Sequence, residues 1–411
     1  MTAHRPGLLG LLAGLALTLP LLGLAAAPAG AGEPPDTCAG EPATIVGTNG
    51  HDVIVGTEGP DVISAGGGSD RIDALGGDDL VCGGGGNDEI LGGDGDDFLY
   101  GEDEDDTLSG GAGDDVLHGG SEGDELAGGP GNDVLRGGSD AFGASDLASF
   151  DGATAGVTVD LAERTSSGET EGTDTLIGIE GARGSAHADM LLGSRLPDLL
   201  IGNGGDDELL GRGGDNTLVA DSGVARGHQG DDVAEVTGTA EVFMGPGEDR
   251  VEAGPGVGTA RLGPGDDHSE THAGSFTIIG GRGQDTFRLW WEDFLDEGPA
   301  LEDPILVGGK GHDRLLWDTP WPVILSVGEG ELTSDYGTAR FTGISHFRGG
   351  EGDDRMYGTD GPQTLVGGFG DDLVKGYGGP DVLRGGPGDD QAFGGPGRDR
   401  CTAEYEHGCE R

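Results

Sequence analysis

Single aliphatic residues recur along the chain between acidic, glycine-rich turns, at a spacing of nine residues. From Gly47 the pattern runs without a gap through Arg136, in ten blocks that begin at every ninth residue. Position eight of each block is Ile, Val or Leu, and its neighbours are of mixed polarity, as in Val116-Leu117-His118. In a short strand the middle side chain points to the opposite face from its neighbours. We therefore predict that position eight faces inward, in a thin core with one aliphatic side chain per block.

The first six positions of each block are predicted to form a tight turn. Glycine fills positions one, two and four in blocks such as Gly110-Gly111-Ala112-Gly113-Asp114-Asp115, and glycine readily adopts the positive φ angles that such turns need. Two nine-residue blocks close a coil of 18 residues, and successive coils stack as parallel strands about 4.8 Å apart. A repeat of this kind indicates a solenoid. The predicted fold class is all-β: a parallel β-roll or β-solenoid of Gly/Asp-rich nonapeptides, with two short inserted strand excursions.

Position six carries the chemistry of the repeat, because it is aspartate in every block of this run. Stacking places the carboxylates of blocks n and n+2 one above the other, and two charges about 4.8 Å apart repel by roughly 3.5 kcal/mol at an effective dielectric constant near 20. A hard divalent cation between the turns removes this repulsion, and calcium suits irregular cages of carboxylate and carbonyl oxygens better than magnesium does. Soft metals are disfavoured because neither Cys nor His recurs at these positions. The candidate ligands are Asp52, Asp61, Asp70, Asp79, Asp88, Asp97, Asp106, Asp115, Asp124 and Asp133.

These blocks resemble the hemolysin-type, or RTX, calcium-binding nonapeptide repeat. The resemblance implies a right-handed parallel β-roll that holds calcium between neighbouring turns on each side. It also implies that the position-six aspartates are ligands and that carbonyl groups of the glycine turns are further donors. Asn216 and Gln363 interrupt the acidic column in later blocks. Matching aspartates in those later blocks extend the candidate metal ligands to Asp189, Asp198, Asp207, Asp354, Asp372, Asp381, Asp390 and Asp399.

The repeat pattern divides the chain into arrays and excursions. After Ala220 the second array loses phase, and only isolated blocks persist. Each excursion shows alternating hydrophobic residues around a Gly-rich turn, which predicts extra strands packed onto the side of the roll. The predicted parts are a signal peptide (1–31), an N-terminal lead-in (32–46), a first calcium-binding repeat array (47–139), inserted strands (140–183), a second, degenerate array (184–312), inserted strands (313–348), a third array (349–402) and a C-terminal tail (403–411).

Composition narrows the possible function classes. Of 411 residues, 91 are glycine, 77 are acidic and 22 are basic, for a formal net charge of −55. So acidic a chain repels nucleic acid, and 34% hydrophobic residues are too few for a conventional enzyme core. A disordered acidic chain and a repeat fold held by cations both fit this composition. The nine-residue period favours the repeat fold.

The two ends of the chain predict an exported protein. His4 and Arg5 precede an apolar run and the small residues Ala29-Gly30-Ala31, which is typical of a cleaved signal peptide. If uncut, the run could instead anchor the chain in a membrane; the mature chain has no further span. An even number of cysteines favours disulfides in an exported protein. We predict the pairs Cys38–Cys82 and Cys401–Cys409, with a four-thiolate zinc site as the alternative.

Isolated motifs give no convincing catalytic set. Gly119-Gly120-Ser121-Glu122-Gly123 matches a serine-hydrolase elbow but lies inside a nonapeptide, without the long strand and helix that the elbow needs. His268-Ser269-Glu270-Thr271-His272 misses the zinc-protease spacing by one residue, and no helix is predicted there. The four tryptophans cluster between residues 290 and 321, where we expect them to pack the second excursion onto the roll rather than to bind a ligand.

The sequence therefore predicts a secreted, extracellular calcium-binding repeat protein whose β-roll folds on binding many calcium ions. We expect a non-catalytic surface, matrix or adhesion role, with calcium ions and cell-surface or extracellular-matrix components as partners and no nucleic acid. The alternative is a secreted hydrolase or polysaccharide-modifying enzyme with its site in residues 220–348. The RTX family's usual export signal is C-terminal, whereas this chain carries an N-terminal one, so the resemblance does not imply toxin-like behaviour.

Overall fold

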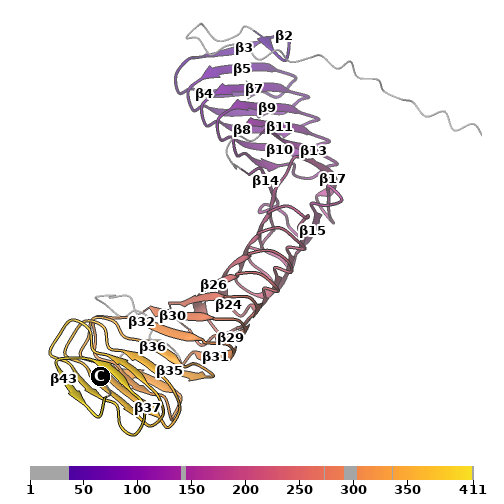
Figure 1. Cartoon of the computed structure of the whole chain (residues 1–411). Helices are drawn as coiled ribbons and strands as arrows, with labels where there is room; N and C mark the ends of the chain where they lie inside the picture. Colours follow the sequence, from indigo (N-terminus) through magenta and orange to yellow (C-terminus); the bar gives the residue numbers. More distant parts are fainter. Residues whose placement is uncertain (1–36, 140–144, 273, 291–302, 336, 410–411) are drawn as a thin grey trace, which may run out of the picture. The chain divides into compact units, whose positions relative to one another are not determined.

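Coils of two short strands stack upon one another along the chain, as Figure 1 shows between β3 and β43. The computed structural model describes residues 37–139, 145–272, 274–290, 303–335 and 337–409. Every regular element within these ranges is a β-strand, and none of them contains a helix with the length and apolar character needed to cross a membrane. The predicted signal peptide (1–31) lies outside the described residues.

One parallel sheet, sheet I, takes one strand from each coil. Each strand pairs with the strand one coil away, so that Leu108 lies beside Ile90 on one side and Leu126 on the other. In order of pairing, sheet I consists of β4 (Val53–Thr57), β6 (Arg71–Leu75), β8 (Glu89–Asp94), β10 (Thr107–Ala112), β12 (Glu125–Ala127), β14 (Leu147–Ser149), β18 (Gly181–Arg183), β20 (Leu199–Ile201), β22 (Thr217–Ala220), β24 (Val233–Gly238), β26 (Arg250–Gly256), β28 (His268–Thr271), β30 (Thr286–Trp290), β32 (Arg314–Asp318), β36 (His346–Arg348), β38 (Thr364–Val366), β40 (Val382–Arg384) and β42 (Arg400–Thr402).

The second sheet, sheet II, takes the other strand of each coil. In order of pairing, it consists of β3 (Ile45–Thr48), β5 (Val62–Gly67), β7 (Leu80–Gly85), β9 (Phe98–Asp103), β11 (Val116–Ser121), β13 (Val134–Ser139), β17 (Gly172–Ile177), β16 (Thr165–Gly168), β15 (Val157–Asp160), β19 (Met190–Leu192), β21 (Asp207–Leu210), β23 (Gly223–Arg226), β25 (Glu241–Phe243), β27 (Thr259–Pro264), β29 (Thr277–Arg282), β31 (Ile305–Lys310), β35 (Gly337–Thr342), β34 (Glu331–Ser334), β33 (Ile324–Ser326), β37 (Arg355–Thr359), β39 (Leu373–Tyr377), β41 (Gln391–Phe393) and β43 (Tyr405–His407). A separate hairpin joins β1 (Thr37–Cys38) to β2 (Glu41–Pro42).

The core between the sheets is a double row of single side chains. Position-eight residues such as Ile90, Leu99 and Leu117 are 0% exposed, whereas the strand residues on either side of them are only half-buried or exposed. The inward position and the thin core are as the period predicts, and the predicted fold class, a parallel β-solenoid of nonapeptides, is confirmed.

The two excursions join sheet II edge to edge, so the expectation that they pack onto its side is wrong. In the first, β15 and β17 pair antiparallel with β16 and parallel with the flanking strands β19 and β13. In the second, β33, β34 and β35 repeat this arrangement between β31 and β37. Unpaired backbone groups at a strand edge favour such pairing, which the alternating sequence pattern alone does not locate.

The apparent loss of phase after Ala220 is a change in coil length. The hydrogen bond that links position six of adjacent coils spans 16 residues from Asn216 to Asp232 and 17 residues from Asp232 to Asp249. It returns to 18 residues from Asp249 to Asp267. The isolated blocks of the sequence are therefore consecutive turns of one continuous stack.

Two disulfides lie near the ends of the described region. Cys38 bonds to Cys82, with a Cα–Cα distance of 5.6 Å, and Cys401 bonds to Cys409, with 5.8 Å. The first links the β1–β2 hairpin to β7, and the second links β42 to the segment after β43. The predicted pairing is the observed one, and it leaves no free cysteine for a zinc site.

Candidate metal centres

Position-six side chains form two ladders, one in the turns that lead into sheet I (column I) and one in those that lead into sheet II (column II). In each ladder one carboxylate oxygen, Oδ1, accepts the backbone N–H of position six in the neighbouring coil. Asp97 N–H donates to Asp115 Oδ1 at 2.8 Å in column II, and Asp88 N–H donates to Asp106 Oδ1 at 2.7 Å in column I. The stacking of carboxylates that the sequence predicts is therefore present, with a backbone donor between successive members.

The other carboxylate oxygen, Oδ2, is buried without a hydrogen-bond donor in most of these turns. Asp97 and Asp115 are 0% and 1% exposed, and neither Oδ2 has a partner. A buried anionic oxygen left in this state costs several kcal/mol. The position-six residues that share this feature are Asp70, Asp79, Asp88, Asp97, Asp106, Asp115, Asp133, Asp207, Asp232, Asp249, Asp267, Asp285, Asp313, Asp372, Asp381, Asp390 and Asp399.

Backbone carbonyls of the next coil converge on the same space. An ideal Cβ placed on Gly92 would lie 2.3 Å from Asp97 Oδ2 and 2.6 Å from the carbonyl oxygen of Gly110, which is position one of the coil above. The equivalent point on Gly101 lies 2.1 Å from Asp106 Oδ2 and 2.7 Å from the carbonyl oxygen of Gly119. Glycine at position one thus leaves room where a carboxylate and a carbonyl oxygen face each other.

The oxygens that could bind a metal here are one carboxylate oxygen and backbone carbonyl oxygens, so no cluster of side chains marks the site. Within the described ranges, no group of three or more His, Cys, Asp or Glu side chains lies in an arrangement that could hold a metal. A cavity lined by carboxylate and carbonyl oxygens fits a hard cation that takes six to eight oxygen ligands, as calcium does. The orphaned Oδ2 atoms are the observation that makes this fit specific.

Burial raises the pKa of several column carboxyls well above the ordinary value of aspartate. Burial, aided by neighbouring carboxylates, raises the pKa of Asp88 to about 7 and that of Asp106 to about 8 in column I. The same cause raises the pKa of Asp115 to about 7 and that of Asp133 to about 8 in column II. Without a counter-ion, these four carboxyls therefore carry less negative charge at neutral pH than exposed aspartates do.

In five of the sequence-predicted ligands, the carboxylate oxygen Oδ2 accepts a hydrogen bond from another group of the protein. Thr48, Thr57, Ser185 and Ser194 donate to the Oδ2 or Oδ1 atoms of Asp52, Asp61, Asp189 and Asp198, respectively. The indole N–H of Trp317 donates to Asp354 Oδ2 at 3.2 Å, and the backbone N–H of Val323 donates to its Oδ1 at 2.8 Å. These five residues belong to the two columns, as do all the other predicted aspartates.

The sequence-derived ligand set omits five column I residues, Asp232, Asp249, Asp267, Asp285 and Asp313, whose Oδ2 atoms are orphaned like those of the first array. Their glycine-containing blocks were visible in the sequence, and the 18-residue spacing of Asp249, Asp267 and Asp285 was the signal that could have added them. Asp174 also occupies the ladder, where it accepts the N–H of Asp133. Its Oδ2 is satisfied by the hydroxyl of Ser166 at 2.5 Å.

Column II loses its acidic residues between β23 and β35. The residues equivalent to position six there are Ala240, Gly258 and Phe276. We identify them by the backbone bond that follows each one: their carbonyls accept the N–H groups of Thr259, Thr277 and Ile305, just as the Asp79 carbonyl accepts the N–H of Phe98. Ala240 and Phe276 are both 0% exposed. In this stretch a continuous acidic column on one side of the core faces an apolar column on the other.

The chain was compared with protein families and with curated proteins. Residues 46–81, 83–117, 118–141, 183–218, 192–226, 342–362 and 366–401 match the RTX calcium-binding nonapeptide repeat. The chain is an RTX-repeat protein. No curated protein matches it. Calcium is therefore the cation of this RTX protein, and its repeats build a calcium-binding β-solenoid.

Outside the columns, the histidines and tryptophans singled out in the sequence contact side chains of the solenoid strands. His268 Nε2 lies 3.0 Å from Glu270 Oε1 on β28, and His272 stacks on Trp290. Trp317 is 1% exposed, whereas Trp290 and Trp321 are 36% and 39% exposed; Trp291 lies outside the described residues.

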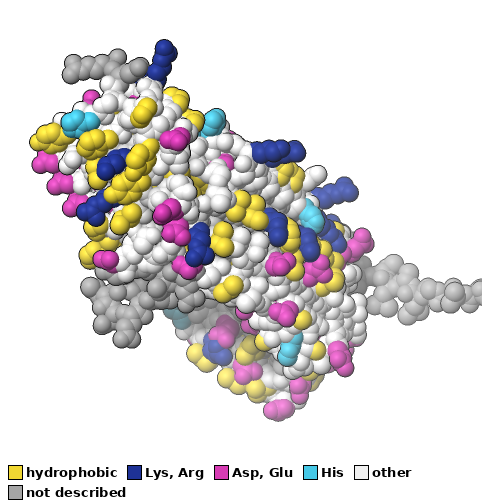
Figure 2. All heavy atoms as spheres, turned by 90° about the horizontal axis from the view of Figure 1, so that it is seen from below, with side chains coloured by type: hydrophobic (Ala, Val, Ile, Leu, Met, Phe, Trp, Pro, Cys, Tyr) yellow, Lys and Arg dark blue, Asp and Glu magenta, His cyan; other side chains and the backbone are white. Residues whose placement is uncertain are grey.

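On the face shown in Figure 2, acidic side chains lie among basic and apolar ones. The negative charge on that face is therefore dispersed.

Proposed function

We propose that this RTX protein is exported and that its solenoid closes only when calcium neutralises the two columns. The observation that carries the proposal is the row of buried Oδ2 atoms without a donor, several of which, such as those of Asp97 and Asp106, face a carbonyl of the next coil. The residues proposed as ligands are the column aspartates with this feature. Bound calcium would supply the positive charge that these oxygens lack, while the protein supplies the carboxylates, the carbonyls and their spacing.

The size of the effect is sufficient to decide whether the chain folds. When free calcium is tenfold above the dissociation constant, each site adds about 1.4 kcal/mol. The seven orphaned aspartates of the first array would together contribute about 10 kcal/mol, which matches the whole stability of an ordinary domain. Those seven are Asp70, Asp79, Asp88, Asp97, Asp106, Asp115 and Asp133.

Two features support an extracellular location. Both disulfides fit an oxidising compartment, and the sequence of residues 1–31 is typical of a signal peptide. Extracellular calcium modules generally have dissociation constants of about 10⁻⁴–10⁻³ M. A chain with such sites would remain expanded in a calcium-poor cell and fold after export.

We further propose a non-catalytic role at a surface or in a matrix, adhesion included. The support is that the described residues of 220–348 serve the architecture of the solenoid. They form β23–β36 in the two sheets, with an apolar column II that continues the core. An enzyme would need a convergent nucleophile, base and oxyanion donor in this stretch.

The test is circular dichroism of the mature chain, with its disulfides intact, in calcium and after chelation with EGTA. We expect a strand spectrum in calcium and a largely unfolded spectrum in EGTA, restored when calcium is added back. Magnesium at the same concentration serves as the control and should restore little. The same strand signal in all conditions would contradict calcium-dependent folding.

A further inference from the structure

Apart from the turn of Asp354, the turns with an orphaned Oδ2 and those with a satisfied position-six side chain differ at position two. Wherever Oδ2 is orphaned, position two has a positive φ, whether it is glycine or not: φ is 116° at Gly93, 80° at His228 and 71° at Tyr377. In five other turns position two is serine or threonine, and none of these residues has a positive φ. The five are Thr48, Thr57, Ser185, Ser194 and Thr359.

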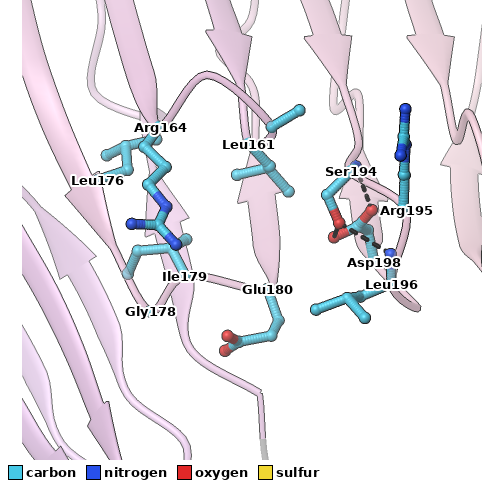
Figure 3. A pocket seen from close by; sticks show the side chains of 11 residues that line it. Leu161, Arg164, Leu176, Gly178, Ile179, Glu180, Ser194, Arg195, Leu196 and Asp198 are labelled. Atoms are coloured by element: carbon cyan, nitrogen blue, oxygen red, sulfur yellow. Dashed lines mark hydrogen bonds between the residues drawn. The ribbon is translucent and has the colours of Figure 1, made fainter.

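In the serine and threonine turns, the position-two residue satisfies the position-six side chain by itself. Thr57 donates its backbone N–H to Asp61 Oδ2 at 2.7 Å and its hydroxyl to the same oxygen at 2.9 Å. Thr48 makes the same pair of bonds to Asp52 Oδ2, at 2.6 and 2.8 Å. Figure 3 shows Ser194 beside Asp198: its backbone N–H donates to Asp198 Oδ2, and its hydroxyl donates to Oδ1 at 3.1 Å. These carboxylates need no external counter-ion.

In the other turns, the same backbone N–H points along the stack instead of into the turn. Gly111 N–H donates to the carbonyl of Gly128, position one of the next coil, at 2.9 Å. His228 N–H donates to the equivalent carbonyl of Met244 at 2.7 Å. The orientation of this one peptide group therefore separates a turn with a satisfied carboxylate from a turn whose Oδ2 has no donor.

The satisfied turns lie at the start of the arrays. Thr48 and Thr57 belong to the first coil of the first array, and Ser185 and Ser194 belong to the first coil of the second. In the third array, Thr359 N–H donates to the neutral Gln363 at 3.0 Å. Its companion Asp354 receives Trp317 and Val323 as described above. Both position-six side chains of each first coil are thus engaged by the protein itself.

We propose that position two selects which turns bind calcium, and that the first coil of each array is a metal-free coil on which the calcium-binding coils stack. The proposal rests on the calcium-dependent folding proposed above. An N–H and a hydroxyl aimed at the carboxylate place positive partial charge where the cation would sit, so calcium is excluded from these turns. A positive φ at position two removes both donors and leaves the oxygen to calcium.

A matched pair of substitutions in column II tests this directly. Asp61 and Asp97 are buried (8% and 0% exposed), and each donates its N–H to the next aspartate, at 2.7 and 2.8 Å respectively. The full mature chain is prepared unchanged, as Asp61→Asn and as Asp97→Asn. Bound calcium ions per molecule are then counted by native mass spectrometry at saturating calcium. We expect Asp97→Asn to bind at least one calcium fewer, and Asp61→Asn to bind the same number as the unchanged chain.

A converse substitution keeps the test decisive if Asp97→Asn fails to fold. Thr57→Gly removes the hydroxyl and permits a positive φ, so we expect the count to rise by one; Thr57→Ser, which keeps both donors, is the control and should leave it unchanged. Equal losses in the two aspartate variants, or no gain in Thr57→Gly, would overturn the selection by position two. An unchanged chain that binds no calcium would instead overturn the proposed function.

Discussion

Replacing one column aspartate by its neutral isostere is expected to change stability in opposite directions with and without calcium. Asp115 is suited to this because its environment is defined on both sides. Its Oδ1 accepts the N–H of Asp97, which an asparagine oxygen can still accept, and its Oδ2 has no donor. Asp115→Asn therefore removes the charge while keeping the shape and the ladder bond.

In the calcium-free protein the substitution should stabilise the coil. Burial raises the pKa of Asp115 to about 7, so at neutral pH the charged carboxylate opposes folding. A rise of about three units from its ordinary value corresponds to at most about 4 kcal/mol, and solvent screening reduces this to about 2 kcal/mol. The amide carries no such penalty, and its N–H₂ group can donate to the Gly128 carbonyl, which lies 2.7 Å from an ideal Cβ on Gly110.

In the calcium-loaded protein the same substitution should destabilise. It removes a charged ligand from one site, and the loss of that site costs about 1.4 kcal/mol at tenfold and about 2.7 kcal/mol at a hundredfold excess of calcium over the dissociation constant. The effect of the substitution thus changes sign between the two conditions.

The assay is thermal unfolding followed by circular dichroism, in millimolar calcium and after calcium depletion. Leu117→Ala in the same block is the control: Leu117 is 0% exposed, and its truncation should cost about 2–5 kcal/mol in both conditions. If Asp115→Asn lowers stability in both conditions, as the leucine control does, the reasoning about the orphaned oxygen is refuted.

Three further predictions follow from the columns, the apolar stretch and the disulfide. Burial raises the pKa of Asp106 and Asp133 to about 8 in the calcium-free fold. Protonation of these carboxyls therefore stabilises the calcium-free fold; this contribution is fully present below the unfolded pKa of about 3.9 and is lost as pH rises through 8. Calcium-depleted protein should thus gain strand signal when it is acidified from pH 8, and an unchanged spectrum would contradict this. Phe276→Ala should cost about 3–5 kcal/mol in thermal unfolding at saturating calcium and leave the calcium count unchanged; a lower count would show that Phe276 supports a site. Reducing Cys38–Cys82, which closes a separation of 44 residues, should lower stability by about 2–4 kcal/mol in melts with and without reductant; identical melts would contradict a stabilising role.

The solenoid was predictable because its two determinants recur at fixed positions. An aliphatic residue at position eight and aspartate at position six are local features, and a nine-residue period places them on the same face of every coil. Pairing between distant strands is not a local feature. The sequence shows that residues near Val157 alternate as a strand, but only the structure shows that β15 pairs with β19 after an antiparallel turn through β16.

The sequence predicted the type of site, an aspartate at position six, but it did not identify every residue that forms one. Asp354 occupies a proper block, yet Trp317, 37 residues earlier, donates to its Oδ2. Thr57 was visible at position two, but the direction of its N–H is a property of backbone geometry rather than of residue type. In the middle of the chain, coils of 16 and 17 residues hid Asp232 from a search at fixed spacing.

The central claim is that calcium binding and folding of the solenoid are one event. A calcium titration of the depleted mature chain, with strand signal and bound calcium measured on the same samples, tests it most directly. The account predicts that both rise together in one cooperative transition and that many ions are bound per chain at its end. A chain that is fully folded before the first ion binds, or that takes up calcium without any change in its spectrum, would contradict it.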